Sequence, residues 1–182
     1  MAPRSYTEIF GWLPQGNVEL LTRLIEDHEV RSVIEVGAFI GKSGAFFAGL
    51  GCKVTSVEPF HRDEPYIDAT LRKRNEDQRQ AFFENTEGHG IRLLEMTSME
   101  AAEQDIEAYL VYLDGSHEYE DVRADIEAWY PKARKILCGD DYSEWWPGVR
   151  QAVDELGDAL YFTKTNVESF SRGQRLWYVV KP

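Results

Sequence analysis

Short runs rich in β-branched and other apolar residues alternate with segments of helical periodicity along most of this chain. The runs occupy residues 32–36, 53–57, 91–94, 109–113 and 135–138. Apolar runs of this length that end at Gly, Glu or Asp are typical of buried strands in a parallel sheet. Strands that alternate with helices form a sheet whose two faces are both covered by those helices. We therefore expect an α/β fold: one doubly wound, Rossmann-like domain.

The intervening segments carry the helical pattern. Helices are expected at residues 17–28, 41–50, 66–85, 98–104, 119–130 and 149–156. Asn17 and Ser98 stand at the start of two of these segments, and Asn and Ser are preferred N-cap residues. Asn17 is thus available as the N-cap of its helix, and Ser98 is a candidate N-cap of the short helix at 98–104.

The end of the chain departs from the alternation. Two further strands, at 160–165 and 174–181, are expected to form a C-terminal strand pair. The sheet would then have seven strands, most of them parallel. Residues 1–182 would be one domain, in which 1–30 form an N-terminal helical segment and 158–182 hold the terminal strand pair.

Charge and cysteine usage narrow the range of partners. The chain has 20 basic and 32 acidic residues, a net charge of −12, and no concentrated basic patch of the kind that nucleic-acid binders carry.

Cys52 and Cys138 each lie in or beside an apolar run and are expected to be reduced core residues. No apolar stretch approaches the ~18 residues of a membrane span, and the first residues lack a signal-peptide pattern. We expect a cytoplasmic protein with no nucleic-acid or membrane partner.

The glycine-containing loop after the first expected strand matches neither of two common nucleotide motifs. A P-loop needs four residues between its glycines, but only three separate Gly37 from Gly41. The dinucleotide fingerprint G-x-G-x-x-G needs a glycine where this chain has Phe39.

The pattern that fits is acidic-x-Gly-x-x-x-Gly, which resembles the nucleotide loop of S-adenosylmethionine enzymes. Glu35 would bind the ammonium group of the cofactor, and Glu58, at the end of the next strand, would accept hydrogen bonds from the ribose hydroxyls. A glycine turn with an unrelated acidic residue is the simpler alternative. The contacts expected from this loop are Glu35, Gly37, Ala38, Gly41 and Ser43.

Three further residues complete the expected cofactor site. Thr97 and Ser98 follow the third strand, where the adenine edge would lie, and Asp114 follows the fourth. Ser98 could either bind adenine or cap its helix, and the sequence does not decide between these roles.

Asp114, Asp140 and Asp141 follow the fourth and fifth expected strands. Ligands of open α/β sheets bind beyond the carboxyl ends of the strands, so these carboxylates are expected to converge. Close carboxylates repel one another unless a proton or a cation lies between them. The sequence therefore predicts a site for a hard divalent cation, Mg²⁺ or else Mn²⁺ or Ca²⁺.

The chain resembles class I S-adenosylmethionine-dependent methyltransferases. It is most similar to the branch that includes the metal-dependent sugar O-methyltransferases of macrolide and aminocoumarin antibiotic synthesis. The resemblance covers about residues 17–153 and is carried by the segments Val33–Ser43, Val57–Phe60, Tyr112–Ile126 and Gly139–Tyr142. It implies that Asp114, Asp140 and Asp141 are metal ligands. Relatives usually carry Pro-Gly-Gly before the fifth strand, whereas here Pro131 is followed by Lys-Ala-Arg-Lys, so the length of that strand stays open.

Methyl transfer to a hydroxyl requires a base within hydrogen-bonding reach of that hydroxyl. Asp114 and His117 are the two candidates. We favour Asp114 because it lies at the strand end itself, where geometry is fixed most rigidly. Trp145 and Trp146 follow the acidic pair and could form a wall of the acceptor site or simply anchor the next helix.

The sequence thus predicts an S-adenosylmethionine-dependent, divalent-metal-assisted O-methyltransferase of a small molecule, with a sugar or polyol as one acceptor class. Three alternatives stay open: a metal-free methyltransferase, a Rossmann-like NAD-dependent oxidoreductase and a non-catalytic relative that binds ligand. The terminal strands could support a homo-oligomer, although no sequence feature selects one.

Overall fold

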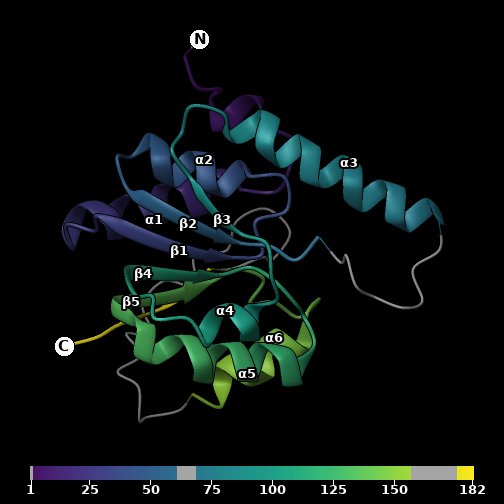
Figure 1. The fold of residues 1–182 in the computed structure, drawn as a ribbon. Coiled ribbons are helices and arrows are strands. Elements are labelled where there is room, and N and C mark those ends of the chain that lie inside the picture. Colours follow the sequence, from purple (N-terminus) through teal and green to yellow (C-terminus); the bar gives the residue numbers. More distant parts are fainter. Residues whose placement is uncertain (1, 61–68, 157–175) are drawn as a thin grey trace.

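A central sheet crosses the computed structural model, which describes residues 2–60, 69–156 and 176–182 (Figure 1). Within these residues it has six strands in the order β3-β2-β1-β4-β5-β6, all parallel except β6, which pairs antiparallel with β5. The strands are β1 (Ser32–Val36), β2 (Lys53–Val57), β3 (Arg92–Leu94), β4 (Ala108–Leu113), β5 (Ala133–Gly139) and β6 (Trp177–Val180).

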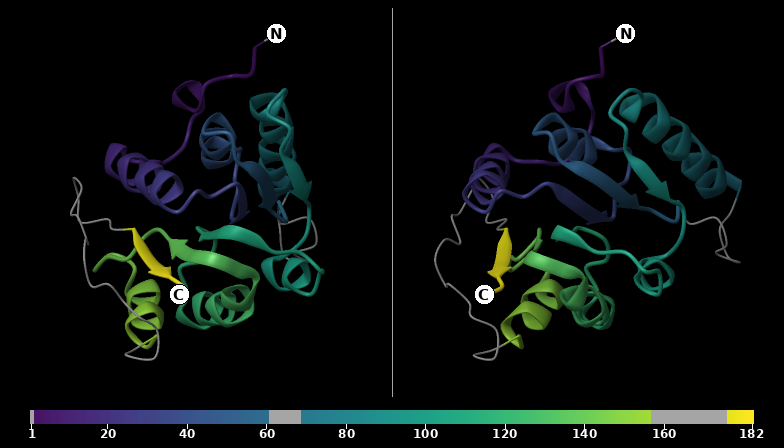
Figure 2. Two further views of the ribbon diagram at one scale, coloured as in Figure 1. Left: turned by 90° about the vertical axis from the view of Figure 1, so that its left-hand side faces the viewer. Right: turned by 60° about the vertical axis from the view of Figure 1, so that its left-hand side comes forward.

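Helices cover both faces of the sheet. In Figures 1 and 2 α1, α2 and α3 lie on one face, and α4, α5 and α6 lie on the other. Two short 3₁₀ turns, η1 and η2, precede α1 and β5. The bounds are η1 (Tyr6–Glu8), α1 (Gln15–Asp27), α2 (Lys42–Gly49), α3 (Ala69–Thr86), α4 (Ser98–Ala102), α5 (Tyr119–Trp129), η2 (Tyr130–Lys132) and α6 (Pro147–Asp154).

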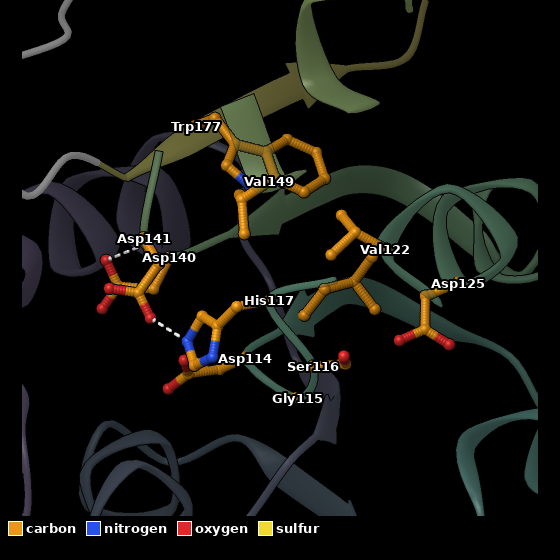
Figure 3. Close-up of a pocket in the computed structure, with 11 residues that line it drawn as sticks. Asp114, Gly115, Ser116, His117, Val122, Asp125, Asp140, Asp141, Val149 and Trp177 are labelled. Carbon is orange, nitrogen blue, oxygen red and sulfur yellow. Dashed lines mark hydrogen bonds and ion pairs between the residues drawn. The ribbon is translucent and has the colours of Figure 1, made fainter. Parts of the chain in front are cut away.

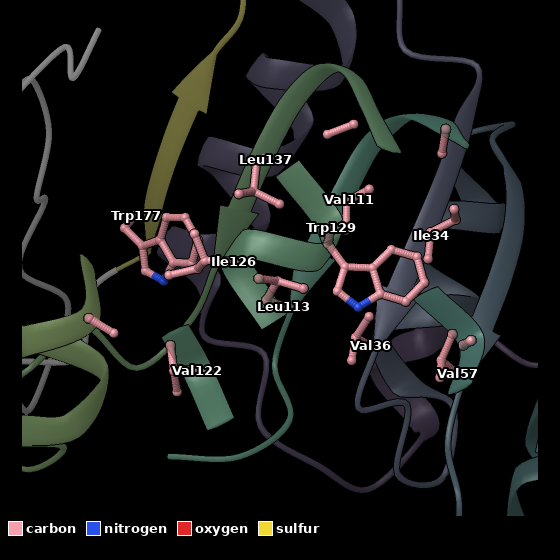
Figure 4. Close-up of a cluster of buried hydrophobic side chains, with 14 of the residues drawn as sticks. Ile34, Val36, Val57, Val111, Leu113, Val122, Ile126, Trp129, Leu137 and Trp177 are labelled. Atoms are coloured by element: carbon pink, nitrogen blue, oxygen red, sulfur yellow. The ribbon is translucent and has the colours of Figure 1, made fainter. Parts of the chain in front are cut away.

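The apolar run of β4 is buried on both sides. Leu110 and Tyr112 pack into the cluster under α1 and α2, whereas Val111 and Leu113 pack into the cluster under α4, α5 and α6. Side chains alternate between the faces of a strand, so a strand covered on both faces needs a continuous apolar run. Trp129, the largest of the fully buried side chains in the described residues, belongs to the cluster under α4, α5 and α6 (Figure 4).

The expected α/β, doubly wound fold is confirmed, but the described residues form six strands rather than seven. The expected strand at 160–165 lies outside the described residues. The fifth strand starts at Ala133, two residues before the position expected. Pro131 lies within η2 directly before it, so the chain passes from α5 into β5 through one tight turn.

Neither Asn17 nor Ser98 is an N-cap residue. α1 begins at Gln15 after Pro14, which places Asn17 inside the first helical turn. In α4 the cap is Thr97, whose hydroxyl accepts the Glu100 N–H, and Ser98 is the first helical residue. In both cases the polar side chain instead bonds a residue distant in sequence, which local preference does not reveal.

Cys52 and Cys138 are buried free thiols, as expected for reduced core residues. Among the described residues, no helix is both long enough and apolar enough to cross a membrane.

Candidate active site

The cofactor loop, Gly37–Gly41, connects β1 to α2 and lies tightly between the ends of β2 and β4. The Gly37 N–H donates to the Val57 carbonyl at 3.0 Å, and the Asp114 N–H donates to the Val36 carbonyl at 2.8 Å. Gly37 has φ +88°, and a Cβ added there would lie 2.1 Å from the Asp114 carbonyl oxygen. Only glycine fits at position 37, and its backbone therefore lies in close contact with the backbone of Asp114, the first residue after β4.

Glu58 holds the middle of the cofactor loop. Its Oε2 accepts the Phe39 N–H at 2.8 Å, and its Oε1 accepts the Phe60 N–H at 3.1 Å. Phe39 has φ +47°, which is uncommon for a residue other than glycine and is stabilised here by this bond. The expected contact of Glu58 with the ribose hydroxyls stays a prediction.

Glu35 lies beneath the loop and is fully buried. It accepts hydrogen bonds from the hydroxyls of Ser43 and Ser56. Burial raises the pKa of Glu35 to about 7, partly offset by these serine bonds. Both carboxylate oxygens thus have partners inside the protein. The expected contact of Glu35 with the cofactor's ammonium group stays a prediction.

The end of the cofactor loop is held by α3. Gly41 has φ +89°, and a Cβ there would lie 2.5 Å from Thr86 Cγ2. Asn85, also buried, donates from Nδ2 to the Ile40 carbonyl at 2.9 Å and accepts a bond from Arg4. Ala38 is buried against Phe60 and Phe82. Sequence patterns gave no signal for this role of Asn85, because Ile40 lies 45 residues away in the chain and comes close only in the folded protein.

Thr97 and Ser98 have their side chains engaged within the protein. Thr97 forms a reciprocal capping box with Glu100. Ser98 donates to Asp125 Oδ1 and accepts the Trp129 indole N–H at 2.8 Å, which ties the start of α4 to α5. The role of these two residues toward adenine stays a prediction.

Asp114, Asp140 and Asp141 meet beyond the ends of β4 and β5, as predicted (Figure 3). Burial and the charges of Asp140 and Asp141 raise the pKa of Asp114 well above its usual range. Burial, and then the charge of Asp141, raise the pKa of Asp140 to about 6. The Tyr112 hydroxyl lies 3.5 Å from Asp114 Oδ2, at the outer limit of a hydrogen bond. With Gly115, Ser116, His117 and Trp177, the three carboxylates line one small pocket.

His117 and Asp141 form a pair. His117 Nε2 lies 2.7 Å from Asp141 Oδ2, and the His117 ring stacks on Trp146 with centroids 3.9 Å apart and planes 16° apart. A carboxylate only accepts hydrogen bonds, so Nε2 carries the proton and Nδ1 is the nitrogen left for proton transfer. Of the two tryptophans, Trp146 thus supports the site, whereas Trp145 is 73% exposed.

Asp140 is held by a residue that the sequence did not suggest. Asn17 donates from Nδ2 to Asp140 Oδ2 at 2.8 Å, and the Asp141 N–H donates to Asp140 Oδ1 at 2.8 Å. Both oxygens of Asp140 are therefore bonded within the protein.

The carboxylates have the donor chemistry of a hard divalent cation, since carboxylate oxygens suit such ions and their mutual repulsion would be relieved by one. The geometry does not match this chemistry. In residues 2–60, 69–156 and 176–182, no group of three or more His, Cys, Asp or Glu side chains is arranged to hold a metal ion. The expected metal site is not formed in this arrangement, in which Asp141 is turned to His117.

The family comparison agrees with this architecture. The family model described as a methyltransferase domain matches residues 34–151, which span β1 to α6. No curated protein matches the chain in sequence.

Solved structures show the same fold. A candidate caffeoyl-CoA O-methyltransferase from Staphylococcus aureus is 18% identical with a TM-score of 0.68, covering 94% of this chain and 86% of that one. An O-methyltransferase from Bacillus cereus in complex with S-adenosylhomocysteine (SAH) is 16% identical with a TM-score of 0.63, covering 93% and 83%. CalS11, a TDP-rhamnose 3'-O-methyltransferase of calicheamicin biosynthesis, is 17% identical with a TM-score of 0.53, covering 91% and 81%.

The family match covers well over half of the chain, and its limits enclose the cofactor loop, Glu58 and the acidic residues at the ends of β4 and β5. The chain therefore belongs to this family of methyltransferase domains.

Proposed function

We propose that the chain transfers the methyl group of S-adenosylmethionine to a hydroxyl oxygen of a small molecule. The observation that carries this proposal is a contact between the cofactor loop and the acidic centre, which is the cluster of Asp114, Asp140 and Asp141. In this contact Gly37 of the loop lies against the backbone of Asp114. A methyl donor bound over the loop would lie beside the carboxylates and His117. Those residues are the groups suited to receive a hydroxyl proton.

The step is a displacement in which all atoms balance. The acceptor oxygen forms a bond to the methyl carbon as the bond between sulfur and that carbon breaks. The electron pair of the broken bond stays on sulfur and gives SAH, and the hydroxyl proton passes to the base.

We assign the base to His117, because Asp141 orients its ring through Nε2 and leaves Nδ1 for the proton. Histidine is the usual acid–base group near neutral pH. Asp114 stays the alternative base that the sequence favoured. Its raised pKa makes it a stronger base when ionised but leaves less of it ionised near neutral pH.

Metal assistance is the second candidate. A divalent ion such as Mg²⁺ would be held by Asp114, Asp140 and Asp141, and it would lower the pKa of a bound hydroxyl. The clustered carboxylates with raised pKa support this candidate, and the engagement of Asp141 with His117 weighs against it. Calorimetric titration with Mg²⁺ or Mn²⁺ on the unmodified protein and on Asp140→Asn tests it without an acceptor.

A sugar or polyol is the acceptor class that we favour, supported by the fold shared with the TDP-rhamnose 3'-O-methyltransferase CalS11. We also propose that residues 1–182 act as one methyltransferase domain, with 1–30 as its N-terminal helical segment and 158–182 as its terminal strand pair.

The proposal is tested by screening hydroxyl compounds for SAH release, with and without a chelator. Release that depends on an acceptor supports O-methyl transfer, and its survival in excess chelator favours the His117 route. Methylation found only at nitrogen or carbon in the products would overturn the proposal.

A further inference from the structure

The first turn of α1 reaches the acidic centre through one side chain. Asn17 is 1% exposed, and its Nδ2 donates to Asp140 Oδ2 at 2.8 Å. Buried amides nearly always have hydrogen-bond partners, but this partner belongs to an element 123 residues further along the chain. The bond therefore joins the N-terminal segment to the end of β5.

The bond continues through Asp140 to the proposed base. The second oxygen of Asp140 accepts the Asp141 N–H at 2.8 Å, and Asp141 has φ +62°, which non-glycine residues adopt rarely. The side chain of Asp141 then bonds His117 Nε2 at 2.7 Å. Three successive hydrogen bonds thus connect Asn17 to His117.

Asn17 is carried by a rigid element. Leu20, Leu21 and Leu24 of the same helix are buried against the sheet. Before the helix, Lys42 of α2 donates from Nζ to the Ile9 carbonyl at 2.7 Å, which ties the preceding segment to the helix that follows the cofactor loop. Groups on packed helices are held more accurately than groups on loops.

We propose that Asn17 is a positioning residue for methyl transfer: it holds Asp140 in the orientation that fixes the backbone of Asp141 and, through Asp141, the ring of His117. The proposal rests on the function proposed above. It gives the N-terminal segment a part in the chemistry, although that segment lies outside the matched family region.

The test needs no acceptor. The unmodified protein and Asn17→Leu are each labelled with ¹⁵N at their four histidines. Their ring N–H signals are compared by NMR at low temperature and mildly alkaline pH. The signal that is missing in His117→Gln is assigned to His117. In the unmodified protein we expect a hydrogen-bonded Nε2–H proton. In Asn17→Leu, which removes the donor at similar volume, this proton should disappear or broaden. The dissociation constant for S-adenosylmethionine should change by less than about twofold, because the cofactor loop is untouched.

Rescue separates positioning from general damage. The double variant Asn17→Asp with Asp140→Asn reverses the donor and the acceptor of the pair, so it should restore the His117 proton that Asn17→Leu loses. Asn85→Leu is the matched control, since Asn85 is also a buried asparagine but holds the cofactor loop at Ile40. It should keep the His117 proton and weaken cofactor binding by roughly fivefold to tenfold.

An unchanged His117 proton in Asn17→Leu would overturn the proposal, and so would its absence from the unmodified protein, because no fixed pair would then exist. If Asn17→Leu does not fold, Asn17→Ser gives the same comparison with a smaller perturbation. Failure of the unmodified protein to bind S-adenosylmethionine would instead overturn the proposed function, so the two failures are distinguishable.

Discussion

The carboxylates of Glu35 and Glu58 differ in burial and in the groups that donate hydrogen bonds to them. Glu58 lies at the end of β2 and bonds two backbone N–H groups, whereas Glu35 is fully buried and bonds two hydroxyls. Backbone N–H donors stabilise the ionised form, and burial favours the protonated form. Glu58 thus holds the backbone of the cofactor loop at Phe39, whereas Glu35 joins side chains of α2 and β2.

Glu35 makes the stability of the protein depend on pH. Its pKa rises from an ordinary value of 4.5 to about 7 on folding, so between these pH values the folded state keeps a proton that the unfolded state has lost. The contribution of Glu35 to stability is therefore complete below pH 4.5 and lost as pH rises to about 7, with an upper limit of roughly 3 kcal/mol.

Glu35→Gln should remove this dependence, because the amide does not ionise. Urea unfolding of both proteins on the acid and the alkaline side of this range measures it. The variant should lose less stability than the unmodified protein on passing to alkaline pH. An equal loss in both would contradict the burial argument.

His117→Ala should lower turnover by roughly 10²–10⁴-fold, the usual loss when a general base is removed. Binding of S-adenosylmethionine should be unchanged. Kinetics with an acceptor from the screen measure this effect, and His28→Ala, at the far end of α1, is the control. If His117→Ala costs little while Asp114→Asn removes activity, the base is Asp114.

Among the helices, α5 and α6 have to pack closely for His117 to meet Asp141. Gly148, in the first turn of α6, permits this contact. A Cβ there would lie 2.5 Å from the His117 carbonyl oxygen and 2.7 Å from the Tyr119 nitrogen, and both of these are backbone atoms. The same turn of α6 follows Trp146, on which His117 stacks.

Gly148→Ala should therefore destabilise the protein by roughly 1–3 kcal/mol, since the backbone contacts have no room to yield. Gly49→Ala is a matched helical control, because a Cβ at Gly49 meets nothing within 4 Å. It should stabilise by about 0.4–1 kcal/mol through the unfolded state. Urea unfolding of the two variants compares them directly, and equal effects would refute the packing argument.

For the molecule as a whole, most of the fold was predictable from local patterns. β1 and β2 match the expected ranges because each is a short run with three β-branched residues that is followed by a recognisable glycine or acidic residue. The expected strand ends also placed Asp114, Asp140 and Asp141 together, beyond the carboxyl ends of two neighbouring strands. The partners of Asn17 and Ser98 were not predictable, because hydrogen bonds between distant elements leave no spacing in the sequence. The pairing of Asp141 with His117 depends on the turn after β5, where Asp141 adopts φ +62°.

The central claim is that this fold binds S-adenosylmethionine between Glu58 and the loop from Gly37 to Gly41. Calorimetric titration tests it most directly, with NADH as the competing ligand. We predict saturable binding of S-adenosylmethionine at one site, no binding of NADH, and an affinity lowered in Glu58→Ala by roughly 1.5–3 kcal/mol, or about 10- to 150-fold. Glu26→Ala, at the exposed far end of α1, should bind as the unmodified protein does. No binding of S-adenosylmethionine, or the same affinity in Glu58→Ala, would contradict the account.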